Sequence, residues 1–179
     1  GNETDGEDPY LTAELGKAFV RGLQGGGEMM KAAACAKHFA VHSGPEAIRH
    51  EFDARASAKD MAETYLPAFE ALVKDADVEA VMGAYNRTNG EPCCGSTTLI
   101  RDLLRGEWGF QGHFVSDCWA IRDFHEHHFV TSSARESAAM ALNAGCDLNC
   151  GNTYLHILAA YQDGPFTAEA ITEPAARLF

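Results

Sequence analysis

Four short apolar runs in this chain each end in, or carry, polar or aromatic side chains that could do chemistry. These side chains are Lys37-His38, Tyr85-Asn86, Ser116-Asp117-Cys118-Trp119, and Asp147 with Asn149. In folds that alternate strands and helices, catalytic groups lie at the carboxyl ends of parallel strands. We therefore expect these side chains to converge on one pocket.

The residue types of this set fit sugar chemistry. A carboxylate such as Asp117 can attack an anomeric carbon and form a covalent glycosyl-enzyme. Lys37 and His38 can donate hydrogen bonds to sugar hydroxyls, and Tyr85 can line the same pocket. The indole of Trp119 offers an apolar surface to the C–H side of a pyranose ring. Asp117 is accordingly the candidate catalytic carboxylate, with the alternative that it caps the helix after it.

Other polar residues favour a structural interpretation. Asp147 is expected to cap or brace a loop. The cluster His125-Glu126-His127-His128 lacks HExxH spacing, and adjacent histidines point to different sides, so we expect a solvated loop and no metal site. No phosphate-binding glycine loop is visible, so no cofactor is expected.

Three competing functions stay open on the residues alone. One is a Schiff-base lyase that uses Lys37 at a strand end, which borohydride trapping would reveal. Another is a metallohydrolase that uses His125, His127 or His128. The third is a catalytically incomplete sugar-binding fragment.

Composition narrows the partners. The 179 residues carry a formal net charge of −12 without a Lys/Arg cluster, which disfavours nucleic acid. No apolar run approaches the ~20 residues that span a bilayer, so no membrane contact is expected. The absence of an initiator Met favours a domain truncated at both ends, and the cellular compartment stays open.

Six cysteines are too few for a disulfide scaffold in a chain of this length, and no CxxC pair occurs. We expect structural or incidental thiols at all six positions, which are Cys35, Cys93, Cys94, Cys118, Cys146 and Cys150.

Helical and strand-like segments alternate along the chain. Apolar spacing, caps and turn residues predict helices over 9–23, 58–74, 97–107, 132–143, 153–162 and 167–179. Short buried strands are predicted over 32–38, 78–84, 114–116 and 145–149. The alternation predicts a parallel α/β sheet, either doubly wound or a (β/α) barrel of the TIM type. A complete barrel needs ~250 residues, so four strands would form a partial one.

Three segments together strongly resemble the N-terminal domain of glycoside hydrolase family 3. They are KHFAVHSGPEAIRHEFDARAS, ETYLPAFEALV and VMGAYNRTNGEPCCGSTTLIRDLLRGEWGFQGHFVSDCWAI, which occur in the family's order. The resemblance covers residues 1–179 and implies the central and C-terminal part of a (β/α) barrel. Glu3 falls in a GRxxET-like motif of the family whose Arg would precede this chain.

The resemblance also implies roles for individual residues. Asp117 matches the catalytic nucleophile, Lys37 and His38 match the pair that binds sugar hydroxyls, and Tyr85 matches a residue that lines the same subsite. Trp119 falls one position later than the Trp that follows the nucleophile in many members. Further residues expected near the site are Arg49 and His50.

The implied activity is that of a retaining, exo-acting β-glycosidase of carbohydrate metabolism, acting on β-glucosides or β-xylosides without a cofactor. Its partner would be a β-linked oligosaccharide or glycoside. Many members take the acid/base Glu from a second domain, and the Asp-His pair of the N-acetylglucosaminidase branch is not evident here. We therefore expect the acid/base in a C-terminal domain of the same chain, beyond residue 179.

Overall fold

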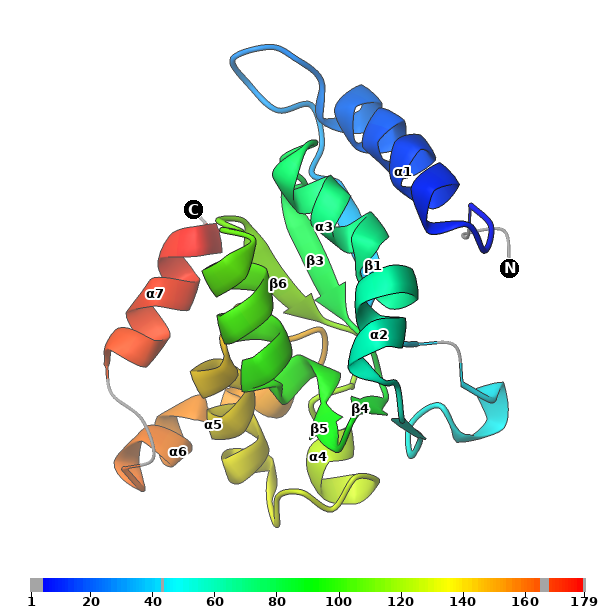
Figure 1. The fold of residues 1–179 in the computed structure, drawn as a ribbon. Helices are drawn as coiled ribbons and strands as arrows, with labels where there is room; N and C mark the ends of the chain where they lie inside the picture. The colour runs from blue at the N-terminus through cyan, green and yellow to red at the C-terminus, as the bar shows by residue number, and fades with distance from the viewer. Residues whose placement is uncertain (1–4, 43, 165–167, 179) are drawn as a thin grey trace.

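A three-stranded parallel sheet forms the centre of the chain. The computed structural model describes residues 5–42, 44–164 and 168–178. The strands β1 (Cys35–Phe39), β3 (Ala80–Gly83) and β6 (His113–Ser116) pair in the order β1-β3-β6. Both pairings are parallel, and Figure 1 shows β3 and β6 pointing the same way. The three strands lie within or next to the predicted segments, which confirms the parallel sheet.

The predicted fourth strand, 145–149, is reduced to one parallel bridge between Val115 and Leu148. The carboxylate of Asp147 accepts a hydrogen bond from the backbone N–H of Phe114, so this N–H cannot pair with a neighbouring strand. The backbone N–H of Cys150 donates to the hydroxyl of Ser116 and not to a strand carbonyl. Four parallel segments thus lie side by side in chain order, as in part of a (β/α) barrel, and the α/β class is confirmed.

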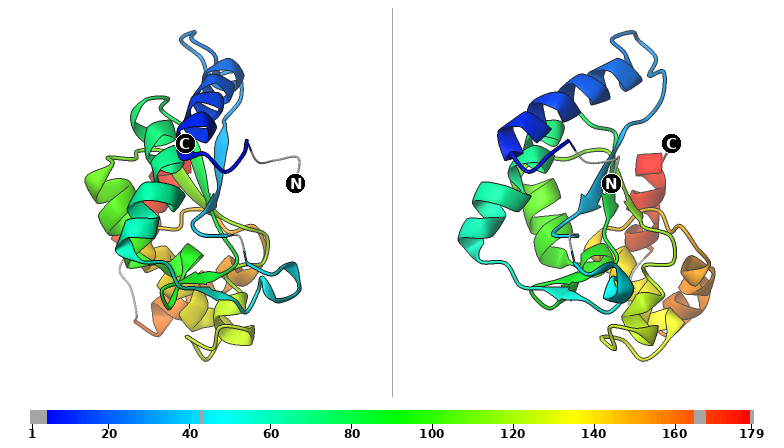
Figure 2. Two further views of the ribbon diagram at one scale, coloured as in Figure 1. Left: turned by 45° about the vertical axis from the view of Figure 1, so that its right-hand side comes forward. Right: turned by 90° about the vertical axis from the view of Figure 1, so that its right-hand side faces the viewer.

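Two helices cover one face of this sheet, as the views of Figures 1 and 2 agree. They are α3 (Pro67–Lys74) and the π-helix η4 (Thr97–Glu107). Buried side chains from the helices, including Val73, Ile100 and Leu104, join Phe39 and Phe114 of the strands in one core. Burial of this apolar surface stabilises the arrangement by roughly 25 cal/mol per Å².

The predicted helix 58–74 is broken into three pieces. Ser57 caps its start as the sequence predicted, and the structure adds a capping box with Asp60. After α2 (Ala58–Asp60), the π-helix η2 (Met61–Tyr65) ends at Leu66, because Pro67 has no N–H to continue the ladder. Of the apolar side chains in this segment, Val73 is buried, and Met61, Phe69 and Leu72 are partly buried against the same core.

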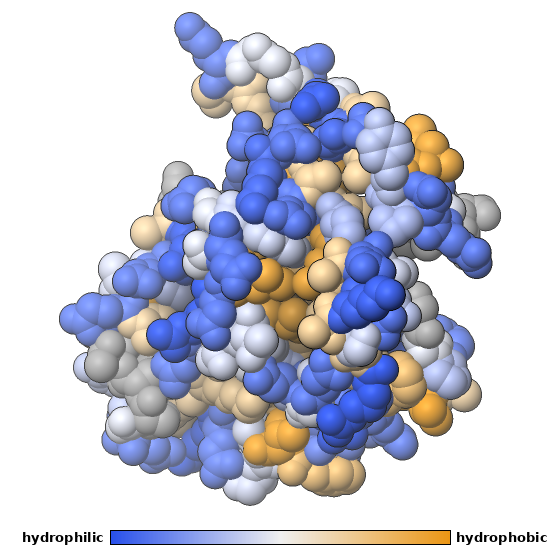
Figure 3. Space-filling model, viewed as in Figure 1, coloured by the Kyte–Doolittle hydropathy of each residue, from blue (hydrophilic) through white to orange (hydrophobic). Residues whose placement is uncertain are grey.

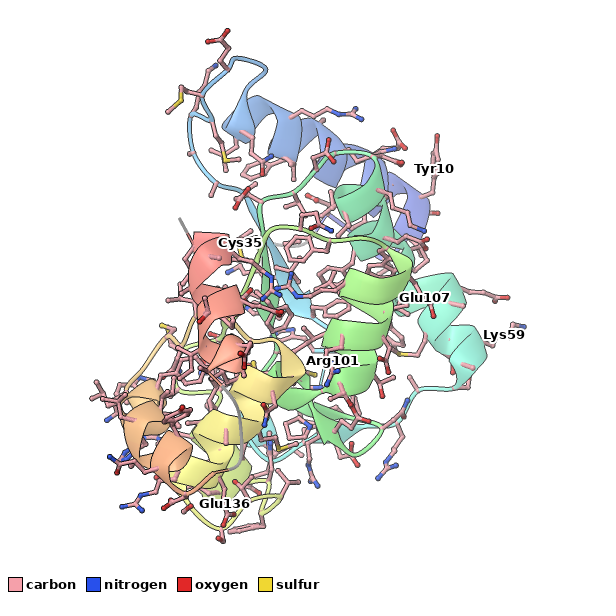
Figure 4. The ribbon with its side chains drawn as sticks, turned by 90° about the vertical axis from the view of Figure 1, so that its left-hand side faces the viewer. Tyr10, Cys35, Lys59, Arg101, Glu107 and Glu136 are labelled. Carbon is pink, nitrogen blue, oxygen red and sulfur yellow. A yellow bond between two sulfur atoms is a disulfide. The ribbon has the colours of Figure 1, made fainter. Side chains whose placement is uncertain are left out.

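Helix α1 (Pro9–Gln24) begins and ends close to where the sequence predicts. The carboxylate of Asp8 accepts from Leu11 N–H at 2.8 Å, and Gly25 follows the last turn with positive φ. The helix packs on α3 and projects from one end of the molecule (Figure 2). Tyr10 points away from it in Figure 4. Its evenly spaced apolar residues are more than a third exposed: Leu11, Leu15, Phe19 and Leu23.

A second small sheet, for which the sequence predicted no strands, lies where the main strands end. Its strands are β2 (Asp53–Ala54), β4 (Arg87–Thr88) and β5 (Glu91–Pro92), in that order. Asn89-Gly90 turns β4 into β5 with both φ angles positive, the geometry of a tight hairpin. Two-residue strands have no periodicity, so the sequence pattern could not reveal them. The short helices η1 (Glu46–Ile48) and η3 (Cys93–Gly95) complete these connections.

The remaining helices follow β6. They are α4 (Asp123–Glu126), α5 (Ala134–Ala144), η5 (Thr153–His156), α6 (Ile157–Gln162) and α7 (Glu169–Leu178), which contains Pro174. The expectation of a solvated loop at 125–128 was wrong, because α4 occupies part of it and His128 is buried. Glu3 lies outside the described residues, as do the two ends of the predicted last helix.

An apolar groove marks the helical face of the molecule between α2 and η2 on one side and η4 on the other (Figure 3). Met61, Leu66, Leu99 and Leu103 are among the residues that line it. None of the predicted strand-end site residues lines this groove. Within the described ranges, no helix has the length and apolar character needed to cross a bilayer.

Candidate active site

The strand register brings β1, β3 and β6 to an end at one level. Phe39 pairs with Gly83, and Gly83 pairs with Ser116. A side chain at Gly83 would collide with Cys94 Sγ and the Phe114 ring, so only glycine allows this close packing. The residues next to this level therefore meet across the sheet.

Asp117 stands directly after β6 with its carboxylate mostly shielded from solvent. Its own N–H donates to Gly83 O at 3.2 Å, which ties the residue to β3. The carboxylate oxygen Oδ1 accepts the N–H of Cys118 at 2.7 Å. The other oxygen, Oδ2, lies 3.4 Å from His38 Nε2 on β1. One oxygen is thus anchored to the backbone while the other faces the side chains of the neighbouring strands.

Tyr85 reaches the same carboxylate from the end of β3. Burial first, and then the charge and hydrogen bond of Asp117, raise the pKa of Tyr85 to about 12. The phenol therefore donates to Asp117 and stays neutral. The Arg49 guanidinium carbon lies 4.9 Å from the Tyr85 ring centroid, and the His50 ring centroid lies 4.4 Å away. The structure accordingly brings Arg49 and His50 beside the strand-end residues.

Lys37 is exposed on β1, next to His38. Figure 4 marks the start of this strand with Cys35. Partial shielding of the thiol from water raises the pKa of Cys35 to about 11, although the residue is exposed overall, with Lys37 lowering the pKa and Asp117 raising it. The charges of Lys37 and Asp117 therefore both act on Cys35 at the start of β1. Lys37 places a cation on the same strand as His38.

Trp119 lies at the rim, with 43% of its surface exposed and a φ of 71°. Its backbone N–H donates to Cys150 O at 2.7 Å. The guanidinium carbon of Arg122 lies 5.1 Å from the indole centroid. The indole is thus available to a ligand that approaches the Asp117 end of β6.

A disulfide between Cys118 and Cys150 corrects the expectation of thiols at all six cysteines. It joins the residue after Asp117 to the end of the next parallel segment. The other four cysteines are free, and Cys93, Cys94 and Cys146 are buried. A signal was present in the sequence, since each bonded cysteine comes just after a predicted strand end and parallel neighbours end together.

Asp147 has the bracing role that the sequence predicted. Its fully buried carboxylate accepts from Arg105 Nη2 at 2.6 Å, from Arg177 Nη1 at 2.7 Å and from Phe114 N–H at 2.7 Å. These bonds tie η4 and α7 to β6. Each of these three bonds to Asp147 is therefore structural.

Asp123 is a site neighbour that sequence reasoning missed. It begins α4, and its carboxylate oxygen Oδ2 lies 2.7 Å from His50 Nδ1. Burial raises the pKa of Asp123, while His50 and His127 lower it. A lone acid in a polar stretch gave no signal of its own, because its burial depends on tertiary packing.

The histidine cluster does not form a ligand set. In the described part of the chain, no three His, Cys, Asp or Glu side chains are placed to hold a metal ion. His125 Nδ1 lies 2.8 Å from Ser137 Oγ, and burial lowers the pKa of His128 to about 4. His127 faces Asp123 at 3.7 Å. These histidines are engaged in local packing.

Comparison with known sequences assigns the chain to a family. The model for the glycosyl hydrolase family 3 N-terminal domain matches residues 1–179. A xylan 1,4-beta-xylosidase of Xylanibacter ruminicola is 52% identical over 159 residues, which is 87% of this chain and 18% of that protein. A probable exo-1,4-beta-xylosidase of Aspergillus clavatus is 43% identical over 188 residues, covering 100% of this chain and 24% of that protein.

Solved structures agree with these sequence relatives. A family 3 exo-beta-xylosidase, XlnD, superposes with a TM-score of 0.95 at 32% identity, over 99% of this chain and 24% of that one. A beta-glucosidase from Listeria innocua in complex with isofagomine superposes with a TM-score of 0.88 at 34% identity, over 98% of this chain and 25% of that one. The chain thus spans a quarter or less of these relatives.

Proposed function

The chain belongs to glycosyl hydrolase family 3, and from that membership we propose that the protein carrying it is a retaining β-glycosidase with Asp117 as its nucleophile. The observation that carries the proposal is the asymmetric hold on the Asp117 carboxylate. Its Oδ1 is anchored by the Cys118 N–H, while Oδ2 faces His38. A nucleophile needs this combination of a fixed direction and one oxygen turned away from the backbone towards the site.

The first chemical step joins Asp117 Oδ2 to the anomeric carbon. The glycosidic C–O bond breaks, its electron pair goes to the leaving oxygen, and a general acid protonates that oxygen. A water then attacks the anomeric carbon from the other side, gives its proton to the same group acting as base, and releases Asp117. The sugar leaves with its original anomeric configuration.

The side chains around Asp117 bind the sugar and orient its anomeric carbon towards Asp117. Lys37 and His38 donate to sugar hydroxyls from the end of β1, and Tyr85 donates to the nucleophile from the end of β3. Arg49 and His50 close the side of the pocket next to Tyr85. Trp119 packs its exposed indole against the C–H side of the glycoside.

The acid/base comes from a part of the protein outside residues 1–179. Retaining enzymes place it about 5–5.5 Å from the nucleophile. Among the described carboxylates, Asp123 bonds to His50 and Asp147 is enclosed by two arginines, so neither is free for this role. The short share of the relatives that this chain spans supports a C-terminal domain as its source.

β-Xylosides are the first choice of substrate within this class. The two relatives at 52% and 43% identity are named xylosidases, while the solved relatives include both xylosidases and glucosidases. β-Glucosides remain the second choice. Xylose differs from glucose by the lack of a hydroxymethyl arm, so the two sugars can be separated experimentally.

A mechanism-based label tests the proposal. The full-length protein is incubated with 2-deoxy-2-fluoro-β-xyloside or β-glucoside carrying a dinitrophenolate, a leaving group that departs without acid help. Peptide mass spectrometry is expected to find the fluorosugar on Asp117, with the xyloside faster. Turnover with the label on another residue would refute the assignment of Asp117. Sugar binding without label or turnover would favour the catalytically incomplete sugar-binding fragment.

A further inference from the structure

The carboxylate of Asp123 is buried beside the strand-end site. Its position in α4 does not explain this burial. Its side chain is 1% exposed. It does not cap α4, whose N-cap position is Arg122 without a side-chain cap bond. Its Oδ1 has no hydrogen-bond partner among the described residues, although His127 Nε2 lies 3.7 Å away. A buried carboxylate is costly unless something requires it, and its one hydrogen bond goes to His50.

That bond and a second one fix the protonation pattern of His50. Nε2 of His50 lies 3.4 Å from Arg49 Nε, which can only donate, so Nε2 must accept. The ring proton then sits on Nδ1 and is donated to Asp123 at 2.7 Å. Asp123, His50 and Arg49 therefore form a directed chain in which the carboxylate sets both the tautomer and the angle of the imidazole.

The far end of this chain holds the ring of Tyr85. The His50 centroid lies 4.4 Å from the Tyr85 centroid at an interplanar angle of 56°, and Arg49 lies 4.9 Å from it. Tyr85 in turn donates its hydroxyl to Asp117. A rotation of His50 would remove one wall from the Tyr85 ring and loosen that hydroxyl.

We propose that Asp123 is a positioning residue that acts through His50 and Arg49 to hold the Tyr85 hydroxyl on Asp117. The inference rests on the proposed function and deepens it by adding a residue that does not touch the sugar. Asp123 follows Asp117 by six residues. It lies on the far side of the His50 ring and acts on the direction of the nucleophile through that ring.

A double-mutant cycle in the full-length protein tests this coupling. The variants are Asp123→Asn, Tyr85→Phe and the pair, measured with an aryl β-xyloside or β-glucoside and by the rate of fluorosugar labelling. We expect Asp123→Asn to lower kcat about tenfold with KM little changed. In the Tyr85→Phe background the same change is expected to cost less than about twofold, since the hydroxyl it positions is gone. Glu126→Gln, an exposed carboxylate on the same helix, is the matched control and should leave kcat unchanged.

The outcomes separate the two proposals. If wild-type protein labels on Asp117 but the effects of Asp123→Asn and Tyr85→Phe multiply, the positioning role is wrong and the proposed function stands. If wild-type protein neither labels nor turns over, the proposed function itself fails. Should Asp123→Asn not fold, His50→Asn, which keeps a donor towards Asp123, enters the same cycle with Tyr85→Phe. Multiplying effects there would equally overturn the relay.

Discussion

His38 Nε2 lies 3.4 Å from Asp117 Oδ2, although His38 lies on β1, Asp117 follows β6, and these two strands are not neighbours. Strand β3 runs between β1 and β6, and both residues stand at the same end of the sheet. The contact is possible because parallel strands present their carboxyl ends at one edge. This edge unites the predicted nucleophile with its predicted sugar-binding neighbours.

Removal of the Asp117 carboxylate is expected to abolish the covalent step. Asp117→Ala should lower kcat/KM for aryl glycosides by at least about 10³-fold. Added azide should partly restore release of the phenol and yield the inverted glycosyl azide, because a small anion fits the space left by the carboxylate. Product analysis by NMR checks this, with Asp102→Ala on the exposed face of η4 as the control. A β-configured azide product would contradict the nucleophile assignment.

His38 is expected to contribute one hydrogen bond to the reacting sugar. His38→Ala should lower kcat/KM by roughly 5- to 100-fold, as expected when a buried partner loses a hydrogen bond at a cost of about 1–3 kcal/mol. His42 stacks on His38 at 4.4 Å, so His42→Phe keeps a ring there and serves as the control. Steady-state kinetics decides the matter, and equal losses in the two variants would assign the effect to packing.

The Cys118–Cys150 disulfide is expected to stabilise the loop after Asp117. The bond closes a loop with a sequence separation of 32 residues. The chain-entropy account assigns such a loop about 3–4 kcal/mol. Cys118→Ser with Cys150→Ser should therefore lower the free energy of unfolding by about that amount in urea titrations. Cys35→Ser, at an exposed free thiol, should change it little, and a similar loss there would argue against a role for the bond.

The carboxylate of Asp147 is expected to be essential for stability and not for chemistry. Asp147→Ala would leave the partly buried Arg105 and Arg177 without their shared partner, at a cost of about 3–5 kcal/mol. Asp163→Ala removes one exposed ion pair with Arg135 and should cost ~1 kcal/mol or less. Denaturant unfolding compares them. A large loss of kcat in folded Asp147→Ala protein would contradict the structural role.

Burial of His128 is expected to make the protein less stable in mild acid. Its folded pKa is about 4, below the ordinary value of 6.5. The unfolded chain therefore takes up a proton between pH 6.5 and 4 while the folded chain does not. The stability contribution is present above pH 6.5, falls through that window by up to about 3 kcal/mol, and changes no further below pH 4.

Comparison of two variants checks that pH dependence. His128→Leu should flatten the free energy of unfolding between pH 7 and pH 4.5, because no imidazole is left to protonate. His156→Leu replaces an exposed imidazole and should keep the wild-type slope. An unchanged slope in His128→Leu would assign the acid sensitivity to other groups.

The local chemistry of the chain was readable from sequence because it depends on neighbours in the chain. Ser57 and Asp8 marked helix starts, and short apolar runs marked β1, β3 and β6. The break at Pro67 was underestimated, since the periodic pattern continued past a residue that cannot donate. Periodicity shows that one face of a helix is apolar, but it does not show what covers that face. In α1 the periodic apolar residues are more than a third exposed.

The sequence by itself determined the α/β class, the family resemblance and the residue types at the strand ends, because those are properties of short segments. Only the tertiary structure decided which of them meet. It joined Cys118 to Cys150, enclosed Asp147 between two arginines, and placed Asp123 behind His50. Those pairings depend on strand register and helix packing between residues up to 73 positions apart, and no local pattern records such distances.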